Sequence, residues 1–294
     1  TVTFDWQDVS TGTPLNEVVF GSKDDDFAGP INIGFSFSFY ENKYTQLYVS
    51  TNGFISFEEP AYTANNERIP LDPPPNNIIA AFWDDLLLPI PSADKPEVAG
   101  GHVYYRLSGV KPDRRLDIQW HDVTLASETS TYNPLTFGLR LYENGDIRFL
   151  YKELNGSLND ATVGIEDRDG TDGCLYLHNA LGLAPGDAVH FHRPPASARV
   201  KFKAPYHSGF AIGYQASFQI ALRNTGDLGQ DRFDLRVQND NPDWQVSLLD
   251  AEGDQPLLDS DHSGFVDTGP LAAGQTFTVT AVSYTHLRAH ETKA

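Results

Sequence analysis

The chain has 294 residues, of which 40% are hydrophobic and 12% aromatic, a composition typical of globular domains. Its 21 basic and 40 acidic residues give a formal net charge of −19, which argues against nucleic acid and anionic membrane surfaces as partners. The length predicts two domains. No stretch approaches the roughly 18 uninterrupted apolar residues of a membrane span.

The ends of the chain predict that it is a piece of a longer protein. It begins at Thr1 and contains no methionine, so we expect any signal peptide to lie upstream, and we expect covalently linked neighbouring domains. Its single cysteine, Cys174, leaves no intrachain disulfide and no cysteine-based zinc site.

Alternating apolar side chains predict strands throughout residues 1–196. The alternation begins with Ile33, Phe35, Phe37 and Phe39, and Asn52-Gly53 between apolar runs predicts a hairpin. A second hairpin is predicted over residues 135–151, turning at residues 143–146. Further strands are predicted at residues 46–50, 78–83, 103–107, 116–120, 161–165, 174–177 and 188–191.

No window of twelve residues shows a helical period, so these strands predict an all-β sandwich of roughly ten strands. The proline-rich segment 192–197 marks the boundary to a second domain. Over residues 197–281, alternation at residues 216–222, 233–237, 244–248 and 277–281 predicts an immunoglobulin-like sandwich. Four or five strands are fewer than the roughly seven of that fold, so we expect this domain to be incomplete.

Residues 282–294 resemble one translated reading frame of a sequencing adapter. We therefore expect this tail to be an artefact of a metagenomic read that has replaced the last strand or two. His286 and His290 have the spacing of a zinc-binding helix, but they belong to the tail and are excluded as a site.

The first domain resembles a nidogen-like β-sandwich module of bacterial secreted and surface proteins, often attached to subtilisin-like peptidases. The resemblance is carried by residues 34–40 (GFSFSFY), 50–57 (STNGFISF), 76–86 (NNIIAAFWDDL), 141–149 (LYENGDIRF) and 161–166 (ATVGIE). It implies an extracellular accessory module and implies no reaction.

The second domain is similar to immunoglobulin-like domains that follow catalytic modules in some bacterial glycosidases and peptidases. The matching segments are residues 224–226 (NTG), 233–235 (FDL), 244–250 (WQVSLLD), 259–261 (DSD) and 267–271 (DTGPL). This resemblance implies a neighbouring catalytic module in the parent protein.

Residues 259–267 (DSDHSGFVD) are the candidate metal site. Oxygen side chains at alternate positions of a tight loop suit calcium, and a glycine permits the sharp turn. The predicted ligands of a structural calcium ion are Asp259, Asp261, Ser263, the Phe265 carbonyl and Asp267. The twelfth position of the loop holds a proline where an EF-hand has glutamate, and an acidic surface turn is the alternative interpretation.

Two groups of acidic residues are candidates for glycosidase chemistry, which needs two carboxyl groups about 5 to 9 Å apart. These are Asp84-Asp85 and the group Glu166, Asp167 and Asp169. Acidic residues at strand ends also accept backbone hydrogen bonds, and we favour that interpretation. We expect no catalytic residue.

Two further patterns have both a functional and a structural interpretation. His190 and His192 share a strand face and are suited to a transition metal, but the sequence identifies no third ligand, so we favour exposed residues beside a linker. A set of tyrosines could form a ligand-binding face or simply fill strands: Tyr62, Tyr104, Tyr105, Tyr132 and Tyr142.

The sequence therefore predicts a non-catalytic accessory or adhesion module of a larger secreted bacterial protein, located outside the cell or on its surface. Its partner would be an unidentified protein or glycan. One alternative is a non-catalytic fragment of a secreted subtilisin-like peptidase. Another is a carbohydrate-binding module, which predicts a row of coplanar exposed aromatic side chains.

Overall fold

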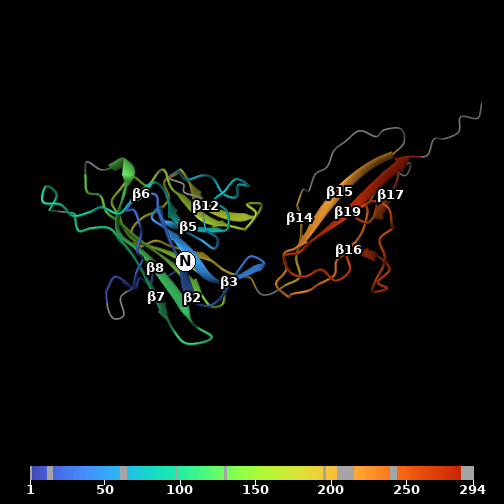
Figure 1. Cartoon of the computed structure of the whole chain (residues 1–294), viewed down its shortest axis with the longest axis horizontal. Coiled ribbons are helices and arrows are strands. Elements are labelled where there is room, and N and C mark those ends of the chain that lie inside the picture. The colour runs from blue at the N-terminus through green and yellow to red at the C-terminus, as the bar shows by residue number, and fades with distance from the viewer. Residues whose placement is uncertain are drawn as a thin grey trace, which may run out of the picture. The chain divides into compact units, whose positions relative to one another are not determined.

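The computed structural model describes residues 2–11, 16–59, 65–96, 98–128, 131–194, 197–203, 215–238 and 244–285. Within these residues every named element is a strand except the 3-10 turn Ala126–Glu128, which confirms the all-β class. The chain forms two compact units, residues 1–194 and 195–294 (Figure 1). No helix in the described part of the chain is long and apolar enough to cross a membrane.

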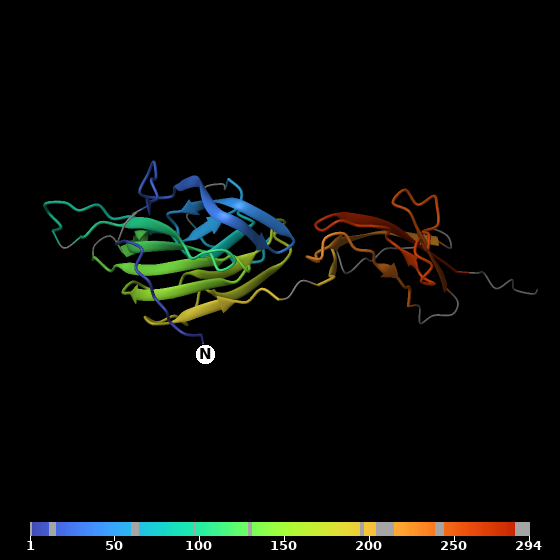
Figure 2. The same ribbon diagram turned by 90° about the horizontal axis from the view of Figure 1, so that it is seen from below.

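The first unit is a sandwich of two antiparallel sheets. One sheet has the order β1-β7-β8-β9-β10-β13, with β6 paired to β8, and the other has the order β12-β11-β5-β4-β3-β2. In Figure 2 the blue strands β2 and β3 lie over the layer of green and yellow strands. The first sheet contains β1 (Asn16–Glu17), β6 (Leu86–Leu87), β7 (His102–Ser108), β8 (Arg115–Leu125), β9 (Leu135–Tyr142), β10 (Ile147–Leu154) and β13 (Ala188–Phe191). The second contains β2 (Phe27–Phe39), β3 (Asn42–Ser50), β4 (Phe54–Ser56), β5 (Ile78–Trp83), β11 (Thr162–Glu166) and β12 (Gly173–His178).

Side chains of alternating strand positions fill the space between the two sheets. Phe37, Phe137 and Phe149 are fully buried in one apolar cluster, as the period of two in these strands predicts. Trp120 of β8 donates from its indole nitrogen to the carbonyl of Ser50 at the end of β3, 2.9 Å away. The Tyr151 hydroxyl donates to the carbonyl of Ala81 at 2.7 Å, so both polar atoms are satisfied in the core.

The predicted turn at Asn52-Gly53 connects β3 to β4. Gly53 has φ of +79°, and a Cβ atom there would lie 1.9 Å from the carbonyl oxygen of Phe82. Only glycine fits this close approach, because any side chain would clash with the backbone of the neighbouring segment.

The second unit contains a four-stranded antiparallel sheet and a two-stranded one. The larger sheet has the order β14-β15-β19-β17, and the smaller pairs β16 with β18. The strands are β14 (Val200–Phe202), β15 (Gln215–Asn224), β16 (Asp234–Leu235), β17 (Trp244–Leu249), β18 (Val266–Asp267) and β19 (Thr276–Thr285). The strand predicted over residues 233–237 is therefore only two residues long. Strand β19 runs into the first four residues of the segment 282–294 that resembles an adapter; His286 and His290 lie outside the described residues.

Candidate functional site

The predicted calcium loop, residues 259–267, follows β17 and ends in β18, and it brings three of its carboxylates together. One oxygen each of Asp259, Asp261 and Asp267 lies within 4.8 Å of the others. Asp259 accepts hydrogen bonds from the backbone nitrogens of Ser263, at 3.0 Å, and Gly264, at 2.9 Å. Backbone hydrogen bonds to the Asp259 carboxylate therefore hold the loop in a tight turn.

The remaining oxygens of this loop also have partners. Asp267 is buried and accepts hydrogen bonds from the backbone nitrogen and hydroxyl of Ser260. Arg232 lies 3.4 Å from Asp261 and 3.7 Å from Asp267. Burial opposes ionisation, but hydrogen bonds from Ser263 and Arg232 hold the pKa of Asp261 below its ordinary value. A calcium ion would compete with Arg232 for Asp261.

The other two predicted ligands make different contacts. The Ser263 hydroxyl donates to Asp234 Oδ1 at 3.2 Å. The ring of Phe265 lies under the guanidinium of Arg236, 4.2 Å from its centroid. The three aspartates are thus the part of the predicted ligand set that the loop brings together.

Asp84 and Asp85 are adjacent in sequence, but their carboxyl groups lie in different environments. Asp84 is buried, burial raises its pKa to about 7, and its Oδ2 has no hydrogen-bond partner among the described residues. Asp85 instead has a carboxylate oxygen within 4.8 Å of Asp24 and Asp25. The three carboxylates repel one another. Burial and the negative charges of Asp25 and Asp24 therefore raise the pKa of Asp85.

The second acidic group accepts hydrogen bonds from backbone nitrogens. Glu166 Oε1 accepts from the nitrogen of Leu71 at 2.6 Å, and burial raises the pKa of Glu166 to about 7. Asp167 Oδ1 accepts from the nitrogens of Thr171 and Asp172, closing the turn between β11 and β12. This geometry agrees with the structural interpretation of strand-end acids.

The histidine pair has a carboxylate neighbour that the sequence did not identify. Asp146 lies immediately before β10. Its Oδ2 is 3.2 Å from His190 Nε2, and its Oδ1 is 3.0 Å from His192 Nδ1. The signal was present in the predicted hairpin, since its turn at residues 143–146 ends in this aspartate, but only the pairing of β10 with β13 brings it to the histidines.

The tyrosines do not share one face in the described structure. Tyr104 stacks on His102, whereas Tyr105, its neighbour on the opposite face of β7, packs against the core. The ring of Tyr142 lies near Arg140 and Arg148. Tyr62 lies outside the described residues.

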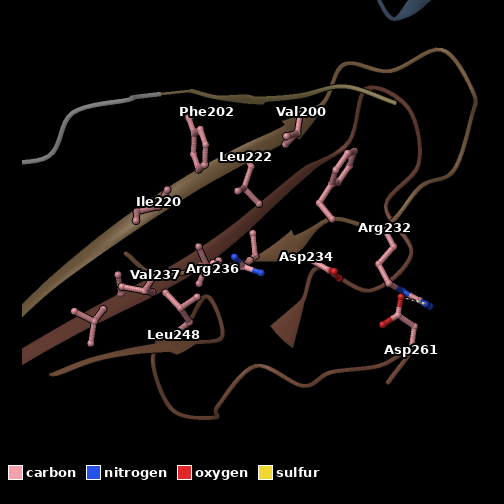
Figure 3. Close-up of a pocket in the computed structure, with 15 residues that line it drawn as sticks. Val200, Phe202, Ile220, Leu222, Arg232, Asp234, Arg236, Val237, Leu248 and Asp261 are labelled. Atoms are coloured by element: carbon pink, nitrogen blue, oxygen red, sulfur yellow. Dashed lines mark ion pairs between the residues drawn. The ribbon is translucent and has the colours of Figure 1, made fainter. Parts of the chain in front are cut away.

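The second unit contains an apolar cavity of about 800 Å³ that sequence reasoning missed (Figure 3). Apolar side chains of β14, β15, β17 and β19 line it, and Arg232 and Asp261 lie together at one end. Val200 and Phe202 on β14 are 41% and 48% exposed, so this face of the sheet is only partly covered. Its lining includes Val200, Phe202, Ile220, Leu222, Phe233, Leu235, Val237, Val246, Leu248, Val279 and Ala281.

A family model described as "NIDO related" matches residues 1–186. No curated protein and no solved structure matches the chain.

Proposed function

Because the chain belongs to the NIDO-related family over residues 1–186, we propose that it is a non-catalytic accessory module of a larger secreted protein, acting in adhesion or in positioning a neighbouring domain. The family match is the observation that carries this proposal. A nidogen-like module implies an extracellular location and a partner that is a protein or a glycan.

The interior of the first unit supports a structural role. Its core is filled by side chains of both sheets, and the buried polar atoms of Trp120 and Tyr151 bond to backbone carbonyls. In the second acidic group, Glu166 and Asp167 likewise accept backbone hydrogen bonds. These contacts stabilise the sandwich and leave the outer surface as the place for a partner.

The second unit fits an immunoglobulin-like sandwich with one incomplete sheet. In that fold one sheet has the order A-B-E-D, and the other contains C, F and G. The sheet order β14-β15-β19-β17 follows this pattern, since β14, β15, β17 and β19 occur along the chain as A, B, D and E. Strand β16, between β15 and β17, takes the place of C.

On this assignment strands F and G would follow β19 in the parent chain and would pair beside β16. We propose that strands F and G fill the apolar cavity. A second sheet in that position would cover the exposed side chains of the four-stranded sheet. The cavity is then the unfilled core of a sandwich. Calcium, bound by Asp259, Asp261 and Asp267, is proposed as a structural ion at the end of the same unit.

The role is tested by applying the fluorescently labelled chain to immobilised collagen, fibronectin and a glycan array, with heat-denatured chain as the control. We expect saturable retention of the folded chain on one of these surfaces. The same preparation is incubated with casein and with soluble polysaccharides, and we expect no hydrolysis. Cleavage of either substrate, or retention no greater than that of denatured chain on all surfaces, would contradict the proposal.

A further inference from the structure

Two histidines and one aspartate converge at the edge of the first sheet. Strand β13 is the edge strand, and its register with β10 places Phe191 beside Ile147 and His190 beside Arg148. His190 lies in β13 and His192 follows directly after its end, and both side chains lie on the side of Asp146. Asp146 itself lies immediately before β10.

The nitrogen and oxygen atoms of this group are spaced as metal ligands are. Asp146 Oδ2 lies 3.2 Å from His190 Nε2, Asp146 Oδ1 lies 3.0 Å from His192 Nδ1, and one ligand atom of each residue falls within 4.8 Å of the others. Ligands about 2.0–2.1 Å from a tetrahedral zinc ion lie roughly 3.3 Å from one another. Small side-chain adjustments would therefore bring all three to one ion.

The carboxylate is held in place by backbone contacts. The nitrogen of Arg193 donates to Asp146 Oδ1 at 2.9 Å, and the nitrogen of Asp146 donates to Asn144 Oδ1 at 3.0 Å. The Arg193 guanidinium donates to the carbonyls of Ser38 and Tyr40, at 3.2–3.3 Å. The positive charge of Arg193 is therefore directed to β2.

Other charges on this face are also paired. Arg148, the register partner of His190, lies 3.4 Å from Asp5, and its guanidinium lies 5.5 Å from the centre of the Tyr142 ring. The histidine-aspartate group is open on one side, since the His192 side chain is 68% exposed whereas those of His190 and Asp146 are 22% and 14% exposed. An ion could thus enter from solvent and retain water at a fourth position.

We propose that Asp146, His190 and His192 form a binding site for a divalent transition metal of the zinc type. Two imidazoles and one carboxylate are a ligand set that suits zinc, nickel and copper, whereas calcium prefers oxygen ligands alone. The imidazole nitrogens of both histidines already face the carboxylate, at 3.2 and 3.0 Å, so the three donor groups converge without a change in the backbone.

The test is a calorimetric titration of the full chain with zinc chloride. Because Cys174 is exposed and His286 and His290 are additional imidazoles, all variants carry C174S, H286A and H290A. We expect one ion per chain with a dissociation constant in the micromolar range, weakened at least tenfold by H190A, H192A or D146N. Each variant's metal-free thermal unfolding shows whether it is folded.

The matched control is H102A. His102 also contacts a carboxylate, that of Glu17 at 2.6 Å, but with one imidazole only. We expect this variant to bind zinc as the parent does. Absence of saturable binding, binding that is unchanged in both H190A and D146N, or equal weakening by H102A would each overturn the proposal.

Discussion

Arg140 on β9 and Asp117 on β8 are register partners, and the buried guanidinium of Arg140 donates from Nε to Asp117 Oδ1. Arg140 also reaches Asp5 through Nη1 at 2.7 Å. A charged side chain on the outer face of a sheet is normally exposed, but here residues 2–11 cover that face, with Val9 donating to Gln119 at 2.9 Å. The ion pair therefore connects the N-terminal segment to two neighbouring strands.

Replacing Arg140 with methionine is expected to lower the unfolding free energy of the first unit by about 2–3 kcal/mol, because the buried carboxylate of Asp117 loses one of its two cations. The loss is less than for a fully unpaired charge, since Arg115 Nε remains 3.1 Å from Asp117 Oδ2. The control is Arg168→Met. Arg168 pairs with Glu58 at 2.6 Å, but both side chains are about half exposed, so the expected loss is below about 1 kcal/mol. Denaturant unfolding of both variants measures the difference, and equal losses would contradict the prediction.

The buried carboxyl of Asp84 predicts a pH dependence of stability. Burial raises its pKa to about 7 in the folded chain, from the ordinary value of 3.8. The folded state therefore holds the proton more tightly than the unfolded state, and this contribution is fully present below the ordinary pKa and is lost as the pH rises through about 7. Glu166 contributes in the same sense, since burial raises its pKa to about 7.

The variant Asp84→Asn removes the ionisable group while keeping an oxygen to accept the hydrogen bond from the Asp85 nitrogen. At pH 8 we expect it to be more stable than the parent by on the order of 1–4 kcal/mol, with the difference shrinking toward pH 4. Urea unfolding across this range provides the measurement, and exposed Asp113→Asn is the control. A difference that does not depend on pH would show that the carboxyl does not titrate as described.

The open cavity of the second unit predicts binding of the hydrophobic dye ANS. We expect fluorescence enhancement with the full chain, reduced by Phe202→Ser and Val237→Ser because both side chains line the cavity and are partly exposed. The control is Val110→Ser, which changes a side chain that is 77% exposed in the first unit. If the control reduces the signal as much as the cavity variants do, the dye binds elsewhere.

The calcium proposal predicts that adding EGTA lowers the melting temperature of the second unit. Asp261→Ala should remove this sensitivity, because it deletes one of the three converging carboxylates, whereas exposed Asp254→Ala in the same unit should retain it. Differential scanning calorimetry with and without calcium measures both. A melting temperature that is unaffected by calcium and by EGTA in the parent chain would end this proposal.

Apolar patterns in the sequence predicted several strands of the first unit closely; residues 78–83 and 188–191 coincide with β5 and β13. Strands of two residues, such as β6 and β18, have no period that a sequence could reveal. The burial of Arg140 has no local signal in the sequence, because it depends on residues 2–11, which cover this side chain without forming a strand.

The candidate sites also differ in how far the sequence predicts them, because some are formed by neighbouring residues and others by residues distant along the chain. The loop at residues 259–267 is local, so its three aspartates could be grouped from spacing alone. Asp146 and His190 are 44 residues apart, and only the pairing of β10 with β13 brings them together. The apolar cavity was equally invisible, because it depends on which strand faces remain uncovered after the sheets form.

The most direct test of the proposed accessory role is the sequence of the intact parent gene. The account predicts an export signal upstream of Thr1, at least one further domain in the same reading frame, and codons that replace those for residues 282–294 and continue into two more β-strands. A gene that encodes no export signal and no additional domain would contradict it.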